Sequence, residues 1–104
     1  MMQDHVTLLN RCAEHCLTQI KAGRGDVKRH AVNHEHLMDC AAICSLTAQL
    51  MVRESPLSKP MHAATAACCE TAAGVLEKSA DNAAVMAACV KSARECAAVC
   101  RQMA

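Results

Sequence analysis

The chain has 104 residues, a formal net charge of +1, nine cysteines and no Phe, Tyr or Trp. This length predicts one domain, residues 1–104, whose core must be built from thiols and small aliphatic side chains. Because the chain has neither a basic face to follow a phosphate backbone nor aromatic rings to stack on bases, we do not expect nucleic acid as a partner.

Turn-forming residues divide the chain into four helical segments. Gly23 and Asp26 mark the first break, Ser55 and Pro56 the second, and the polar residues 78–82 the third. We predict helices over about 3–22, 26–54, 58–78 and 81–102, with Ser55 or Ser58 capping the third. Connections this short make neighbouring helices antiparallel, so the predicted fold is all-α: an up-down-up-down four-helix bundle.

The membrane and secretory signals are missing from the sequence. No run of about eighteen uncharged apolar residues predicts a membrane span. The first residues contain neither the basic region nor the apolar stretch of a secretory signal. We therefore expect a cytoplasmic protein, in which thiols stay reduced and dense cysteine indicates metal binding or redox chemistry rather than disulfides.

Three of the predicted helices carry two cysteines four residues apart, which places both thiols on one helix face. These pairs are Cys12 and Cys16, Cys40 and Cys44, and Cys96 and Cys100. The geometry of adjacent helical turns suits a shared metal ion better than a disulfide. The third predicted helix carries Cys68 and Cys69 instead.

The cysteines fall on one stripe along each helix, and these stripes predict the core of the bundle. Aligning antiparallel helices in seven-residue steps brings four thiols to one level: Cys12, Cys44, Cys69 and Cys96. This layer would lie about 10 Å from an end of the bundle that carries His5, Met51, His62 and Met103. The thiols of Cys16, Cys40, Cys89 and Cys100 would lie above and below the layer, and only Cys68 falls off the stripe.

Stacked thiols favour a soft ion, and Cu(I) is the first candidate. A single four-thiolate zinc site at the shared layer is an alternative, and a structural or interaction bundle in which cysteine serves as a small hydrophobic residue is another. The end with His5, Met51, His62 and Met103 would be a weaker metal site, and we expect its two histidines to be solvated, as histidines at helix ends usually are.

Other groupings carry weaker signals. The histidines His30, His34 and His36 are expected to form an exposed polar face. A redox function would need an accessible thiol of low pKa beside a base, and its candidates are Cys12 with His15, or the neighbours Cys68 and Cys69. No pair of carboxylates and no nucleophile constellation is present, so we do not expect an enzyme.

Three segments resemble the bacterial copper storage proteins, in particular their cytosolic, cysteine-rich type. These segments are Asp39-Cys40-Ala41-Ala42-Ile43-Cys44, the turn Ser55-Pro56-Leu57, and the ending Cys89-x6-Cys96-Ala-Ala-Val-Cys100-Arg101-Gln102-Met103-Ala104. The resemblance implies a bundle whose interior cysteines hold many Cu(I) ions, in subunits that form homotetramers. It assigns the lining to Cys12, Cys16, Cys40, Cys44, Cys69, Cys89, Cys96 and Cys100, and leaves out Cys68.

The sequence departs from the family pattern at positions where a cysteine would continue the lining. These positions hold His5, Leu9, His62, Thr65, Ala72, Leu76, Met86 and Ala93. Because these residues are mostly apolar and would pack a dry core, we expect low-capacity storage or buffering, with a few Cu(I) ions around the shared layer.

Overall fold

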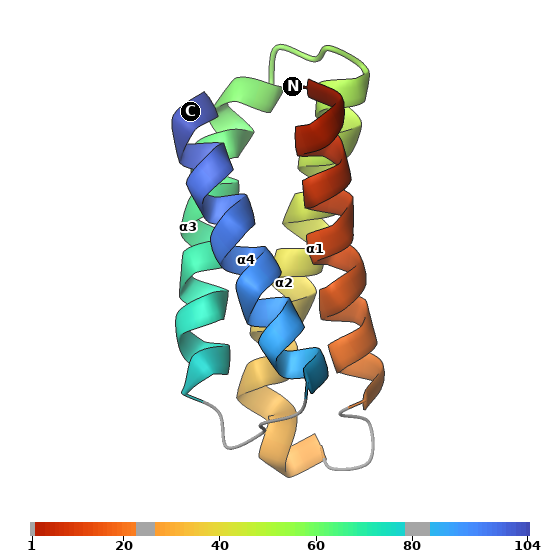
Figure 1. Cartoon of the computed structure of the whole chain (residues 1–104), viewed down its shortest axis with the longest axis vertical. Helices are drawn as coiled ribbons and strands as arrows, with labels where there is room; N and C mark the ends of the chain where they lie inside the picture. The colour runs from red at the N-terminus through yellow and green to blue at the C-terminus, as the bar shows by residue number, and fades with distance from the viewer. Residues whose placement is uncertain (1, 23–26, 79–83) are drawn as a thin grey trace.

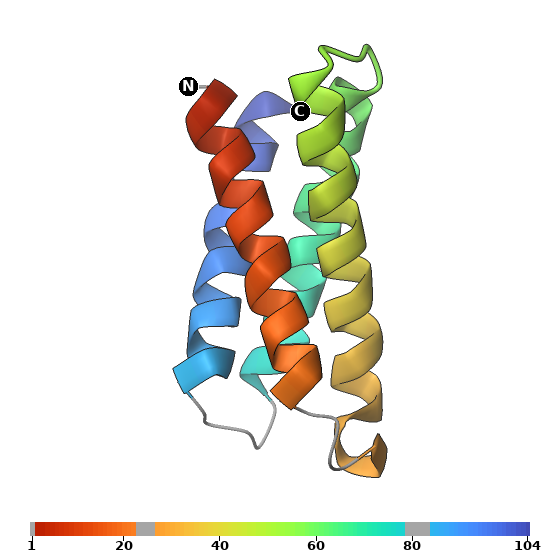
Figure 2. The same cartoon turned by 90° about the vertical axis from the view of Figure 1, so that its right-hand side faces the viewer.

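The computed structural model describes residues 2–22, 27–78 and 84–104, which form four helices and, within these ranges, no strand. The helices are α1 (Met2–Ala22), α2 (Val27–Val52), α3 (Ser58–Glu77) and α4 (Ala84–Met103). Helices that follow one another in sequence run in opposite directions, as Figures 1 and 2 show from two sides. The predicted all-α four-helix bundle is confirmed.

The four helices surround one interior. Helix α1 packs against α2 and α4, and α3 packs against the same two helices. Eight cysteines and the side chains of Leu9, Thr47, Thr65 and Leu76 are fully buried between them. Most of these side chains are small, which lets the helices approach closely, and the bundle measures 40 × 19 × 19 Å.

The turn between α2 and α3 closes α2 two residues before its predicted end. Glu54 has a left-handed backbone, with φ 54°. The N–H of Glu54 donates to the carbonyl of Met51 at 3.0 Å, and the N–H of Ser55 donates to the carbonyl of Leu50 at 2.9 Å. This is the Schellman arrangement, in which a left-handed residue ends the helix and satisfies its last carbonyls.

The start of α3 differs from the prediction at its cap. The N-cap residue is Leu57, and no side chain caps the helix, so the prediction of Ser55 or Ser58 was wrong. Ser55 lies in the turn instead, where its hydroxyl accepts a hydrogen bond from the N–H of Leu57 at 3.2 Å. The predicted helix starts at residues 26 and 81 lie outside the described residues.

One end of the bundle gathers the first turns of α1 and α3 and the last turns of α2 and α4. We call it the terminal end, because both ends of the chain lie there, at the top of Figure 1. None of the helices in the described part of the chain combines the length and the hydropathy that a membrane span requires.

Candidate metal centre

The interior of the bundle is lined with thiols. Eight cysteines have no exposed surface: Cys12, Cys16, Cys40, Cys44, Cys69, Cys89, Cys96 and Cys100. All nine cysteines of the chain are free. The eight buried residues are the ones on the predicted stripes, because residues three and four apart stay on the core-facing side of a helix.

Each helix contributes one thiol to a cluster at the middle of this lining. The sulfur atoms of Cys12, Cys44, Cys69 and Cys96, the four-thiol cluster, all lie within 4.8 Å of one another. Cys44 Sγ is 3.5 Å from Cys69 Sγ and 3.9 Å from Cys96 Sγ. An ion held tetrahedrally by bonds of about 2.3 Å separates its sulfur ligands by about 3.8 Å. The cluster predicted from seven-residue steps therefore has the size that a soft, four-coordinate ion requires.

A second group of thiols adjoins the first. Cys12, Cys16 and Cys40 also lie within 4.8 Å of one another. Cys40 Sγ is 3.7 Å from both Cys12 Sγ and Cys69 Sγ, and Cys16 Sγ is 3.6 Å from Cys89 Sγ. The seven-residue steps predicted Cys16 and Cys40 on the layers above and below the four-thiol cluster and did not predict this group, although Cys12 and Cys16 share one face of α1. The thiols thus form a connected network rather than separate layers.

Hydrogen bonds between the thiols distribute their protons unequally. The hydrogen bond between the thiols of Cys12 and Cys16 lowers the pKa of Cys12 and raises the pKa of Cys16. The bond from Cys100 lowers the pKa of Cys96 to about 5, while that of Cys100 is raised. Within the four-thiol cluster, the lowered pKa values of Cys12 and Cys96 favour the thiolate, which is the metal-binding form of cysteine, whereas the pKa values of Cys44 and Cys69 are raised.

The terminal end differs from its predicted arrangement. His5 and His62 are only 4% and 3% exposed, so the expectation that they would be solvated was wrong. They continue the core stripes of α1 and α3, and their rings stack with centroids 5.1 Å apart. Met51 is buried beside this end of the core, but Met103 is 40% exposed, because α4 ends at this residue and no further turn covers it.

A pair of hydroxyls lies in the core between the terminal end and the four-thiol cluster. Thr47 and Thr65 are fully buried, with their oxygens 2.8 Å apart. The Thr65 hydroxyl donates to the carbonyl of Met61 at 2.7 Å, so the Thr47 hydroxyl donates to Thr65. Both hydroxyl protons are thereby used within the protein, and this level of the core offers no thiolate from α3.

The candidates for redox chemistry do not meet its requirements. Cys12 is fully buried, and the Nδ1 atom of His15 lies 2.5 Å from the hydroxyl of Ser92. Burial, and then the charge of a Cys40 thiolate, raise the pKa of Cys68 to about 11, which is the opposite of an activated thiol. Cys68 is half-buried in a surface pocket between α2 and α3.

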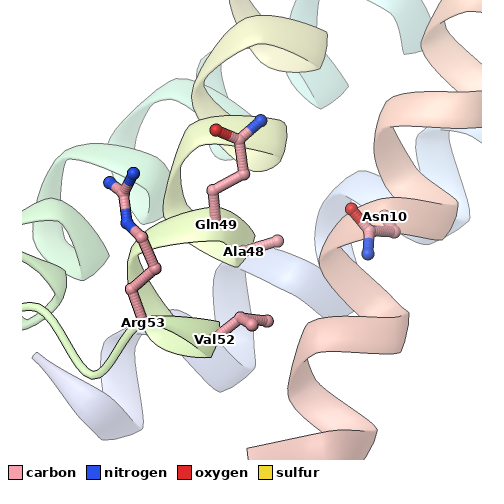
Figure 3. Close-up of a pocket in the computed structure, with 5 residues that line it drawn as sticks. All are labelled: Asn10, Ala48, Gln49, Val52 and Arg53. Carbon is pink, nitrogen blue, oxygen red and sulfur yellow. The ribbon is translucent and has the colours of Figure 1, made fainter.

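Further polar residues lie outside the two groups of neighbouring thiols. His34 is exposed and His36 is half-buried, while the side chain of His30 lies outside the described ones. A groove between α1 and α2 is lined by Asn10, Ala48, Gln49, Val52 and Arg53 (Figure 3) and includes none of the predicted metal ligands.

One buried polar residue of the core was not predicted. Gln19 is buried three residues beyond Cys16 on the stripe of α1, and extending that stripe along the sequence would have predicted its burial.

Fold and lining together define a helical bundle with an interior of thiol ligands. The sequence profile of the copper storage protein family matches residues 1–104, and the chain belongs to this family. A solved structure, the Cu(I)-bound copper storage protein BsCsp3, has the same fold, with a TM-score of 0.90 and 24% identity over 98% of this chain and 96% of that one. No curated protein matches the sequence.

Proposed function

We propose that this protein stores or buffers Cu(I) in the cytoplasm, with the thiolates of its eight interior cysteines as ligands. The observation that carries the proposal is the connected network of eight fully buried thiols. Family membership supports it, as does the likeness to a fold that is known with Cu(I) bound. Soft thiolates in a buried interior favour Cu(I) over cations that prefer oxygen ligands.

The number of thiols separates copper from the zinc alternative. A structural zinc ion takes four ligands, so eight interior thiols provide complete, unshared ligand sets for two Zn²⁺ ions. Cu(I) is satisfied by fewer thiolates, and neighbouring ions can share a sulfur atom. The same network therefore accommodates more Cu(I) than Zn²⁺.

The apolar part of the core sets the capacity. Leu9, Ala72, Leu76, Met86 and Ala93 are buried at positions where the family resemblance implies a cysteine. These side chains fill space and offer no ligand, except for the thioether of Met86. We propose low-capacity storage or buffering, with ions concentrated around the four-thiol cluster and with His5, Met51 and His62 as weaker ligands at the terminal end.

The compartment and the assembly belong to the same proposal. Nine free cysteines are compatible with a reducing cytoplasm, which keeps thiols available for Cu(I). A homotetramer, as the family resemblance implies, would give partners to Met38, Leu46 and Val52, which are exposed apolar side chains on α2. Light scattering on the purified chain tests this assembly, and a monomer at working concentration would contradict it.

The deciding experiment is an anaerobic titration of the reduced apo protein with Cu(I) against a chromophoric Cu(I) chelator. We expect the protein to withhold more than two Cu(I) ions per chain from the chelator. A parallel titration with Zn²⁺ serves as the comparison, since eight thiols provide unshared four-ligand sets for two zinc ions. Retention of one or two ions, with zinc bound more tightly than copper, would move the proposal to a zinc site.

A structural or interaction bundle remains the second candidate, because much of the lining is apolar and packs without a metal. It predicts that the chelator removes all of the copper from the protein. In that case the buried cysteines serve as small hydrophobic residues, and the surface of the bundle becomes the place to look for function.

A further inference from the structure

Two imidazoles and one thiol meet at the terminal end. They lie outside the four-thiol cluster and outside the second group of thiols. The Nε2 atoms of His5 and His62 are 3.1 Å apart. The sulfur atom of Cys100 lies 3.7 Å from Nε2 of His5. These side chains come from α1, α3 and α4, so the three helices converge on one small volume of the core.

The distances match those between ligands of one tetrahedral ion. Bonds of about 2.0 Å to nitrogen and about 2.3 Å to sulfur place two nitrogens about 3.3 Å apart and a nitrogen and a sulfur about 3.5 Å apart. Two edges of the ligand triangle already have this size. The ligand atoms of His62 and Cys100 are more than 4.8 Å apart, so a shared ion requires one of these side chains to rotate.

The environment of the rings allows this adjustment. Both rings are at least nine-tenths buried, yet Nδ1 of His5 and Nδ1 of His62 have no hydrogen-bond partner. The two rings therefore have no hydrogen bond that would oppose this rotation other than the contacts of Nε2 with each other and with Cys100 Sγ.

We propose that His5, His62 and Cys100 together form a metal site for a borderline divalent cation, Zn²⁺. Imidazole and thiolate are both good ligands for Zn²⁺, whereas oxygen-preferring cations are disfavoured by this set. Two neutral imidazoles and one thiolate leave a net positive charge and an open fourth position on the ion. The site rests on the proposed function, which already counts Cys100 among the interior thiolates and His5 and His62 among the weaker ligands. It adds that these three side chains hold one ion together and that this ion is Zn²⁺.

The missing aromatic residues provide a direct test. Since the chain has six histidines and no Phe, Tyr or Trp, its aromatic C–H proton signals come from imidazoles alone. Reduced apo protein is titrated with Zn²⁺ under nitrogen until a metal indicator reports free Zn²⁺. Single substitutions assign the signals of the other four histidines, which identifies His5 and His62 by elimination: His15→Gln, His30→Gln, His34→Gln and His36→Gln.

We expect the signals of His5 and His62 to shift together, with one equivalent of Zn²⁺. Cys100→Ala should weaken this step tenfold or more, because loss of a direct ligand costs at least as much as loss of an outer-shell partner. Cys89→Ala, which removes a buried thiol outside the site, is the matched control and should leave it unchanged. Unmoved His5 and His62 signals at saturating Zn²⁺ would overturn the proposal. Because these signals are measured in the wild-type chain without copper, this outcome would leave the proposed copper function untouched.

Discussion

Neighbouring cysteines on α3 show how a helix face decides the chemistry of a thiol. Cys69 is fully buried, with its sulfur 3.7 Å from that of Cys40 and 3.5 Å from that of Cys44. Cys68 is half-buried at the surface and outside the two groups of neighbouring thiols. A rotation of about 100° about the helix axis separates one core position from one surface position.

This contrast predicts different effects for two adjacent substitutions. Cys69→Ser removes a sulfur ligand from the four-thiol cluster, so we expect the loss of at least one Cu(I) equivalent in chelator competition. Cys68→Ser makes the same chemical change one residue away and should leave the stoichiometry unchanged. Equal losses in both variants would show that the cluster is not the main copper site. Circular dichroism would check that both variants keep their helices.

The burial of His5 predicts a pH dependence of stability in the apo protein. Its pKa is lowered from 6.5 by burial and by His62, so below about pH 6.5 the unfolded chain binds a proton that the folded chain does not. Stability contributed by the neutral ring is present above that pH and falls as the pH falls, by at most about 1.4 kcal/mol per pH unit.

Urea unfolding at several pH values between about 7.5 and 5.5 measures this dependence. His5→Leu should reduce the slope of stability against pH in this range. His34→Gln replaces an exposed histidine and should keep the wild-type slope. An unchanged slope in His5→Leu would mean that other groups cause the pH dependence.

At the level of elements, the turn after α2 contains a strained residue. Glu54 occupies the left-handed position that ends the helix, with φ 54°. Glycine is preferred at this position because it has no Cβ to collide with the backbone. We expect Glu54→Gly to raise the free energy of unfolding by about 0.5 to 1 kcal/mol, which is the relief of strain less the greater entropy of glycine in the unfolded chain.

The urea midpoint of the apo protein measures this gain. Glu54→Ala is the matched control, since it removes the carboxylate but keeps the Cβ, and it should not stabilise the protein. An equal gain in both variants would assign the effect to the charge of Glu54 rather than to its backbone.

Helical periodicity explains why the thiol layer could be predicted and the terminal end could not. Residues of a stripe keep facing the core as long as a helix continues on both sides, and Cys12, Cys44, Cys69 and Cys96 are all in this situation. Near a helix end, the face of the helix on which a residue lies does not by itself determine whether its side chain is exposed. His5 and His62 are covered there, whereas Met103 is not. Pairing of His5 with Cys100 depends on how two helices from opposite ends of the sequence pack, and no local pattern contains that information.

The whole molecule should respond to copper as one cooperative unit. A ligand that binds only the folded state stabilises it, by about 2.7 kcal/mol per site at a free concentration 100 times its Kd. For a domain of this size we expect Cu(I) to raise the Tm by about 10 °C or more. Anaerobic thermal unfolding followed by circular dichroism measures the change. A Tm that Cu(I) leaves unchanged would favour the structural bundle.

The antiparallel course of the helices brings both ends of the chain to the terminal end, beside His5, His62 and Cys100. A polyhistidine purification tag on either terminus would therefore be tethered next to these residues and would add a high local concentration of competing imidazoles. Metal stoichiometries obtained from tagged protein would include this contribution. Protein for metal measurements should be prepared without a tag, or with the tag removed by proteolysis.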